Sequence, residues 1–174
     1  MLRNAAVTCV APTGTLSLLA ECSSGIEPFF ALASVRHALD GRSLTKVNGA
    51  AIDALEALGP IGLHAIDDVC ERGSMRGIVG IPDTLAQRFP IALELSPLAH
   101  VRMQAAFQRH VDAAVSKTVN LPTTASPSDV RQVFDAARRL KLKGVTVYRY
   151  GSKSHQALSL VKDERVPDCR ECAV

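Results

Sequence analysis

The sequence predicts an α/β protein, because strand and helix signals alternate along its second half. Residues 115–121 are mostly β-branched or apolar and stop at Pro122, as a strand would. Ser126-Pro127-Ser128-Asp129 then has the order of a helix start, with a capping serine, a proline in the first turn and an acid at the third position. Residues 145–148 follow Gly144 and favour a second strand. This strand–helix–strand spacing is typical of an α/β fold.

Turn and capping residues mark the other expected elements. The apolar residues 5–11 are expected to form a buried strand, and residues 14–20 a short helix. Asn48 can cap a helix that Gly59-Pro60 would stop. From Gly151 onward the chain turns polar, which predicts a mobile tail. Further expectations are a helix over 61–72, a helical turn over 83–89, a helix from Ser96-Pro97 to about 114, and a polar loop around 40–43 that follows apolar residues 29–39.

Apolar stripes on two of these helices indicate which faces should pack inward. His110 lies on one stripe, and we expect it to be a core histidine because no second metal ligand stands at a suitable spacing. The stripe of the longer helix comprises Met103, Ala106, Phe107, His110 and Ala114, and that of the later helix Val130, Val133, Phe134, Ala137 and Leu140.

Composition excludes several classes of function. The chain has 174 residues, is 47% hydrophobic and carries a formal net charge of +3, which suits one globular domain with a core. The short basic run 138–143 is expected to be a solvated helix end rather than a nucleic-acid surface. No secretory signal or stretch of about 20 apolar residues is visible, which predicts a cytoplasmic protein without a membrane partner.

The five cysteines are odd in number and unevenly spread, unlike a secreted disulfide framework. Cys9 and Cys22 lie in apolar or turn surroundings, where packing is the expected role. Cys169 and Cys172 form a Cys-x-x-Cys pair near the C-terminus. Such a pair is a redox dithiol, half of a zinc site or an inert pair, and the spacing alone leaves these alternatives open.

The most informative motif is Pro12-Thr13-Gly14-Thr15-Leu16-Ser17. An apolar run breaks there at a turn and leads into a helix-compatible segment. Backbone N–H groups at a helix start lack partners and favour an anion, so a phosphate is the expected guest. No Gly-Lys-Ser/Thr follows, so this is not the loop of ATPases. The alternative is an ordinary β-turn with a Thr or Ser helix cap.

Residues 3–33, which contain this motif, resemble the large subunit of ribonucleotide reductases, in particular the adenosylcobalamin-dependent (class II) type. The similarity covers nearly all of the chain, but only the C-terminal part of that family's catalytic chain. It implies the last strands and helices of a ten-stranded α/β barrel, incomplete alone because missing strands would leave edges exposed. Residues 1–150 would be the barrel segment and 151–174 the tail. Further matching motifs are Arg76-Gly77-Ile78, His100 to Gln108, His110-Val111-Asp112, Val115 to Pro122 and Lys143 to Arg149.

The resemblance also implies a chemistry. The family reduces the 2′-hydroxyl of a ribonucleotide for DNA synthesis, using adenosylcobalamin to generate a thiyl radical on one cysteine while two further cysteines supply electrons. Those cysteines belong to upstream segments, so no catalytic residue is assigned here. The matching loop, Pro12 to Leu16, would hold the substrate's diphosphate or triphosphate. Gly14 would let the backbone approach, Thr13 and Thr15 would offer hydroxyls with the amides of 14–16, and Ser17 would add another hydroxyl.

Two roles stay open for Tyr148, which matches a Thr-Val-Tyr strand of the family. A related tyrosine of the class I enzymes lies on the radical path, whereas the cobalamin-dependent type does not need one. The alternative is an aromatic side chain packed on the last strand. Tyr150 and Lys153 depart from the family, which commonly has Asp and Arg there.

The expected partners follow from the same resemblance. They are a ribonucleoside di- or triphosphate, an N-terminal reductase segment with the catalytic cysteines, and a thioredoxin-like reductant; no nucleic acid is expected. Family tails of the Cys169 and Cys172 kind relay electrons or fold as a zinc ribbon, and we place relay first. The predicted function is thus the C-terminal segment of an oxidoreductase, a vitamin B12-dependent ribonucleoside-diphosphate reductase. The alternative is an inactive nucleotide-binding remnant or a modulator of an intact reductase.

Overall fold

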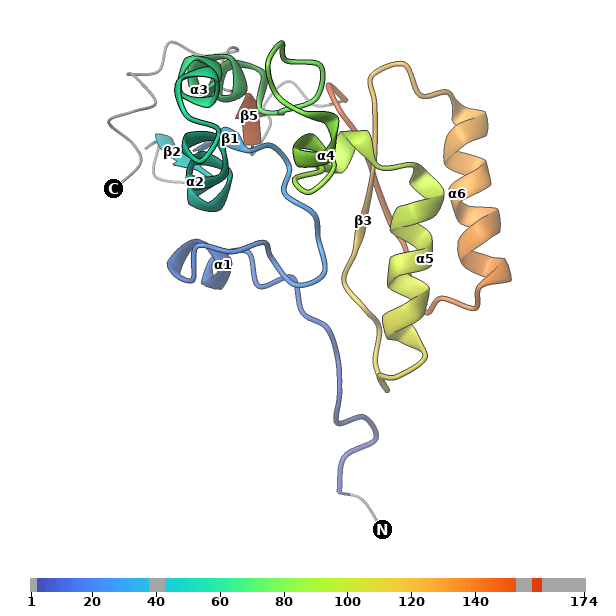
Figure 1. The fold of residues 1–174 in the computed structure, drawn as a ribbon. Helices are drawn as coiled ribbons and strands as arrows, with labels where there is room; N and C mark the ends of the chain where they lie inside the picture. Colours follow the sequence, from blue (N-terminus) through green and yellow to red (C-terminus); the bar gives the residue numbers. More distant parts are fainter. Residues whose placement is uncertain (1–2, 38–42, 153–157, 161–174) are drawn as a thin grey trace. The chain divides into compact units, whose positions relative to one another are not determined.

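A computed structural model describes residues 3–37, 43–152 and 158–160 of the chain (Figure 1). It has the mixed helix and strand content that the sequence predicts. Two compact units are formed: one joins the N-terminal residues up to Pro28 with those from Ala92 to 152, and the other consists of Phe29–Ile91 with the strand Leu158–Leu160. Within the described ranges, no helix has the length and apolarity that crossing a membrane would require.

The first unit is built on a parallel strand pair with its crossover helix. Strands β3 (Thr118–Leu121) and β4 (Thr146–Arg149) pair in parallel, and helix α6 (Pro127–Arg139) connects them. Helix α5 (Pro97–Gln108) packs against both β3 and α6, as Figure 1 shows. The predicted βαβ unit is therefore confirmed. Its core holds Val101, Val119, Leu121, Val133 and Ala137. The unit also contains helix α1 (Leu16–Leu19) and the 3-10 turn η1 (Ala92–Glu94).

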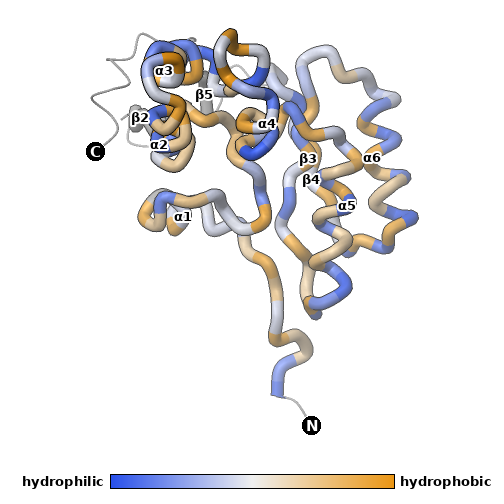
Figure 2. Tube along the Cα trace, in the orientation of Figure 1, coloured by the Kyte–Doolittle hydropathy of each residue, from blue (hydrophilic) through white to orange (hydrophobic). Residues whose placement is uncertain are grey.

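Helix α6 begins at the residues that the sequence indicated. The Ser126 side chain accepts a hydrogen bond from the Asp129 amide, and the Asp129 carboxylate accepts one from the Ser126 amide at 2.8 Å. This reciprocal capping box satisfies amides that a helix start leaves unpaired. Hydrogen bonding to Ser126 also lowers the pKa of Asp129. Hydrophilic and hydrophobic residues alternate along the helix in Figure 2, as expected for a helix with one buried face.

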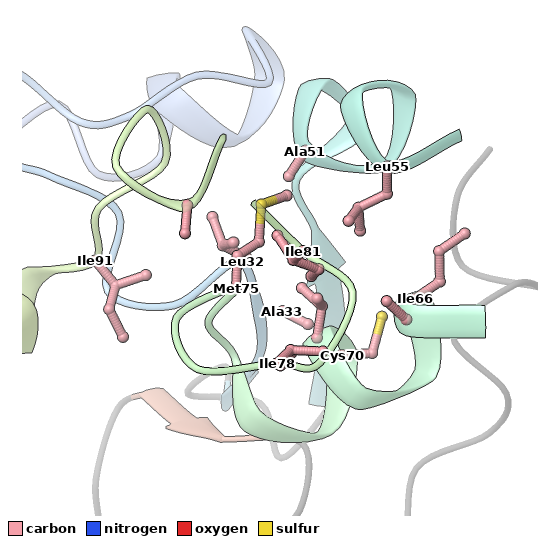
Figure 3. Packing of buried hydrophobic residues seen from close by; sticks show 13 residues of the cluster. Leu32, Ala33, Ala51, Leu55, Ile66, Cys70, Met75, Ile78, Ile81 and Ile91 are labelled. Atoms are coloured by element: carbon pink, nitrogen blue, oxygen red, sulfur yellow. The ribbon is translucent and has the colours of Figure 1, made fainter. Parts of the chain in front are cut away.

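The second unit packs two helices on a small antiparallel sheet. Strand β1 (Ala33–His37) lies between β2 (Ser43–Val47) and β5 (Leu158–Leu160). Helices α2 (Gly49–Glu56) and α3 (Pro60–Arg72) pack on each other, and α3 also contacts β1. A short helix, α4 (Asp83–Ala86), follows. Figure 3 shows Leu32, Met75 and Ile81 pointing toward one another in the core of this unit.

One predicted strand is absent and the strands of the antiparallel sheet were not predicted, because strands depend on their neighbours. Residues 5–11 form no strand; Val10 makes a single parallel bridge to Val115, and the Val7 side chain is 62% exposed. With pairing limited to that bridge, apolar residues alone do not make a ladder. Strand β1 was not predicted, because what makes it a strand is pairing with β2 and with the distant β5. Most of the predicted tail, 151–174, lies outside the described residues.

The inward face of α5 also differs from the predicted stripe. The helix ends at Gln108 rather than near 114, and Met103 and His110 are exposed. The expectation of a core histidine at 110 is therefore wrong. Polar Gln104 is buried instead, because its amide donates to the carbonyls of Val115 and Gly144 at 2.8 and 2.9 Å. Hydrophobic periodicity cannot reveal a polar side chain that is buried for its hydrogen bonds.

Two glycines test the packing of α2 on α3. A Cβ on Gly62 would lie 1.8 Å from the Leu55 carbonyl oxygen, whereas a Cβ on Gly49 would meet nothing within 4 Å. We expect Gly62→Ala to lower the free energy of unfolding by about 3 kcal/mol or more, because backbone must move. Gly49→Ala should be neutral or stabilising by up to about 1 kcal/mol, since alanine favours a helix. Urea unfolding of both variants checks this; equal stabilities would contradict the close helix contact.

Candidate functional site

The turn over residues 12–17 leads directly into helix α1. Thr13 has a φ of 53°, in the left-handed region that β-branched residues rarely adopt. Its carbonyl accepts the Ser17 amide at 2.9 Å, which is the first bond of the helical turn. The expectation of a short helix over 14–20 is met by α1, although it spans only Leu16–Leu19. The chain thus reverses sharply at Thr13 and presents the residues that follow to one side.

Two hydroxyls of the loop are used inside it. The Thr13 hydroxyl donates to the Pro12 carbonyl at 2.8 Å and accepts from the Gly25 amide at 2.9 Å. The Ser17 hydroxyl donates to the Gly14 carbonyl at 2.9 Å, and Ser17 is buried. A hydroxyl has one proton to donate, so both protons already shape the loop. In this conformation Thr13 and Ser17 hold the loop's shape, and the Thr15 hydroxyl is exposed.

The outer side of the loop can accept an anion. Within the described part of the chain, the amides of Thr15 and Leu16 have no acceptor. A Cβ placed on Gly14 would meet no atom within 4 Å, so the space beside the backbone is open. Backbone amides without an acceptor are the kind of donor that a phosphate can use. The Thr13 hydroxyl, in contrast, already accepts from the Gly25 amide.

Gly25 fits closely behind the loop. Its φ of 54° lies in the left-handed region, and a Cβ there would come within 3.0 Å of the Ala11 carbonyl oxygen. The Gly25 amide donates to the Thr13 hydroxyl, so the segment after α1 supports the turn from behind. The Glu27 amide donates to the Ser24 carbonyl at 2.9 Å, which closes a tight turn around Gly25. Only glycine satisfies both the conformation and the close approach at this position.

A buried ionic cluster lies next along the same segment. Lys117 is 3% exposed, and its ammonium contacts the Glu27 carboxylate in an ion pair. The ammonium also donates to the Thr118 carbonyl at 3.0 Å. The other Glu27 oxygen accepts the Thr118 amide. Glu27 is therefore tied twice to the start of β3, by charge and by backbone.

His100 completes this cluster from helix α5. It is 1% exposed, and its Nε2 lies 3.0 Å from the Ala92 carbonyl oxygen, which can only accept. The proton is therefore assigned to Nε2, and Nδ1 accepts from the Lys117 ammonium at 2.9 Å. Burial, and then the positive charge of Lys117, lower the pKa of His100 below its ordinary 6.5. The imidazole is neutral at pH 7, and the lysine has three acceptors.

The remaining predicted residues lie elsewhere. Tyr148 is half-buried on β4, next to Val147 of the first unit's core. Cys169 and Cys172 lie outside the described residues. Cys9 and Cys22 are exposed rather than packed. Among the described side chains, no group of three or more His, Cys, Asp or Glu is placed to hold a metal ion.

Sequence reasoning missed the cluster even though its members lie in recognised motifs. Glu27 lies in the segment after the loop, and Lys117 is the one charged residue of the predicted strand 115–121. The lysine could have indicated a buried ion pair from the sequence, because a charge within a buried strand needs a partner. The partner itself could not be named, since Glu27 lies 90 residues earlier. His100 lies in a family-like motif without a periodic signal of its own, whereas the apolar stripe of the predicted helix points to His110.

Comparison with known proteins identifies the class. The family model of the ribonucleotide reductase barrel domain matches residues 2–148. The chain is 51% identical over 157 residues to a vitamin B12-dependent ribonucleoside-diphosphate reductase of Mycobacterium tuberculosis (strain CDC 1551 / Oshkosh), covering 90% of this chain and 22% of that protein. It is 42% identical over 158 residues to the Thermoplasma acidophilum enzyme of the same name, covering 91% of this chain and 20% of that one.

A solved structure shows the same fold. The class Id ribonucleotide reductase alpha subunit of Actinobacillus ureae matches with a TM-score of 0.62 and 19% identity, over 80% of this chain and 25% of that chain. A parallel strand pair with its crossover helix is what a part of an α/β barrel would contain. The chain belongs to the ribonucleotide reductase barrel domain family. It spans about a fifth of the length of the curated relatives that it matches.

The neutral state of His100 predicts a pH dependence of stability. Because the folded pKa lies below 6.5, the unfolded chain binds more protons than the native one just below that pH. The contribution of neutral His100 to the free energy of unfolding should be fully present above about pH 6.5. It should fall as the pH is lowered toward the folded pKa, by at most about 1.4 kcal/mol per pH unit for one proton. Urea midpoints between pH 7.5 and 5.5 measure this.

The matched control for this prediction is His100→Gln. A glutamine amide can donate and accept like the neutral imidazole but does not titrate. The variant should lose the slope between pH 7.5 and 5.5 even where its absolute stability differs. An identical slope in the variant and the wild-type chain would contradict the assignment of the effect to His100.

Proposed function

We propose that this chain is a segment of a vitamin B12-dependent ribonucleotide reductase and that it carries the loop that binds the substrate's phosphates. The observation that carries the proposal is the loop at residues 14–16: among the described residues the amides of Thr15 and Leu16 have no acceptor, Thr15 is exposed, and a Cβ on Gly14 would meet no atom within 4 Å. Family membership supports it, as do the names of the curated relatives. Those names point to a ribonucleoside diphosphate as the substrate, and a triphosphate is the alternative.

The loop binds with dipoles rather than with side-chain charges. Its six residues, Pro12 to Ser17, include no lysine or arginine. Two amides and one hydroxyl therefore hold the terminal phosphates, and Gly14 leaves room for their oxygens. Pro12, Thr13 and Ser17 contribute by shaping the turn. Discrimination between nucleobases must come from other parts of the enzyme, because this loop contacts only the anionic end.

The rest of the reaction belongs to the complete enzyme. The cysteines that carry the radical and the reducing electrons are expected in an N-terminal reductase segment. Adenosylcobalamin would supply the initiating radical when bound to the complete enzyme, and we assign no residue of this chain to it. Cys169 and Cys172 would relay electrons from a thioredoxin-like protein. Tyr148 would serve as a packed aromatic side chain on β4. The enzyme would work in the cytoplasm to supply DNA precursors.

A side chain at residue 14 should block phosphate binding without unfolding the chain. Gly14→Val places methyl groups in the open space beside the backbone, so pyrophosphate and cytidine diphosphate should bind about tenfold more weakly or worse, a loss of about 1.4 kcal/mol. Gly144→Val is the matched control: that glycine lies in the same unit, and its Cβ also meets nothing within 4 Å. Calorimetric titration of the full 174-residue chain measures both.

Three results would count against this function. They are no detectable binding of pyrophosphate by the wild-type chain, equal loss in the two glycine variants, and equal affinity for cytidine and cytidine diphosphate. A further test uses the whole enzyme, by co-expression with an N-terminal segment of a B12-dependent reductase. Ribonucleotide reduction by the joined pieces, lost with Gly14→Val, would support an enzymatic role over that of a binding remnant.

A further inference from the structure

We propose that Glu27, Lys117 and His100 form a positioning cluster that sets the conformation of the loop at residues 12–17. The importance of that conformation rests on the proposed phosphate function, but the structural link itself can be tested without a ligand. The cluster does not touch the open side of the loop. It acts through Gly25, which lies between Glu27 and the back of the turn.

The first link is the attachment of Glu27 to β3. One carboxylate oxygen pairs with the Lys117 ammonium and the other accepts the Thr118 amide, so the side chain cannot rotate without breaking two bonds. Lys117 is held in turn by His100 and by the Thr118 carbonyl. Because Lys117 is only 3% exposed, water cannot replace these three protein acceptors of its ammonium. Glu27 is therefore the fixed end of this segment.

The second link runs from Glu27 to Gly25. The Glu27 amide donates to the Ser24 carbonyl, which closes a turn with Gly25 inside it. Gly25 has a left-handed backbone conformation, and a Cβ at this position would come within 3.0 Å of the Ala11 carbonyl oxygen. Fixing Glu27 therefore fixes the direction in which the Gly25 amide points.

The third link is the bond from Gly25 to Thr13. The Gly25 amide donates to the Thr13 hydroxyl at 2.9 Å, and this hydroxyl in turn donates to the Pro12 carbonyl at 2.8 Å. Thr13 is a β-branched residue at φ 53°, a conformation that persists only where the surroundings hold it. The Thr13 carbonyl accepts the first amide of the α1 turn. Releasing Gly25 would thus release the residue on which the loop's reversal depends.

Positioning explains the cluster better than general stability does. Burying two charges costs solvation, and apolar residues of similar size are often as stable or more so. This arrangement instead joins three separate segments: the turn at Glu27, helix α5 at His100 and the start of β3 at Lys117. Directional bonds fix relative geometry in a way that apolar contacts do not. The cluster therefore fixes the position of the turn from Ser24 to Glu27, which supports the loop.

A double-mutant cycle separates positioning from stability. Glu27→Leu and Lys117→Met each leave one buried charge unpaired, whereas the double variant removes both, so its unfolding midpoint should recover toward that of the wild type. The readout is amide hydrogen exchange of Gly25 in the full chain, followed by NMR. Val133 in α6 is the reference amide. Ser126→Ala is the control, because it removes the α6 cap in the same unit without contacting the cluster.

We expect Gly25 exchange to accelerate about tenfold in both single variants and to stay fast in the double variant, since the tie is absent even where stability returns. Ser126→Ala should leave Gly25 unchanged relative to Val133. The inference is overturned if Gly25 is unprotected in the wild type, if its exchange rises only in step with Val133, or if the double variant restores its protection.

A pyrophosphate titration of the same variants keeps the two proposals apart. Weaker binding in the double variant, alongside fast Gly25 exchange, supports both. If the wild type fails to bind pyrophosphate while Gly25 responds as expected, the phosphate function fails and the positioning role stands. If the wild type binds and the double variant binds equally well, the cluster does not set the binding conformation and the inference fails alone.

Discussion

The arrangement of the first unit depends on the hydrogen bonds and the ion pair of the buried Lys117 ammonium. A buried charge at the start of β3 cannot be solvated, so the fold must bring it three acceptors. Glu27 comes from 90 residues earlier and His100 from 17 residues earlier. Meeting this one requirement brings the N-terminal turn, α5 and the parallel strand pair together. The neutral imidazole is part of the same requirement, because a protonated His100 could not accept from the lysine.

A second constraint concerns the parallel strand pair, which forms an incomplete sheet. Parallel strands are normally covered on both faces, yet β3 and β4 form a two-stranded sheet with α5 and α6 beside it. Residues 5–11 approach β3 through one bridge, at Val10 and Val115, and remain largely exposed. These exposed apolar edges fit part of a barrel, and the chain spans about a fifth of the length of its curated relatives. Met103 and Phe107 on α5 are exposed as well.

Local signals predicted most of the helices and the crossover. The Asn48 cap, the glycine that ends α3 at residue 73 and the Ser126 capping box each act within one turn of chain, so neighbouring residues are enough to reveal them. Prediction failed where the outcome depends on distant partners. β1 needs β5, and Gln104 is buried because the carbonyls of Val115 and Gly144 accept its amide. Neither long-range strand pairing nor burial that depends on a hydrogen bond to a loop carbonyl leaves a periodic signal in the sequence.

The sequence by itself determined the helix starts, the α/β order and the reversal at Thr13-Gly14, because capping groups and turn residues act on adjacent backbone. Its long motifs also led to the reductase family. Only the tertiary structure decided which polar groups are buried together: it selected His100 over His110, paired Lys117 with Glu27, and committed the Thr13 and Ser17 hydroxyls inside the loop. The physical reason is that burial and long-range pairing are properties of the folded chain, whereas propensity is a property of a few neighbouring residues.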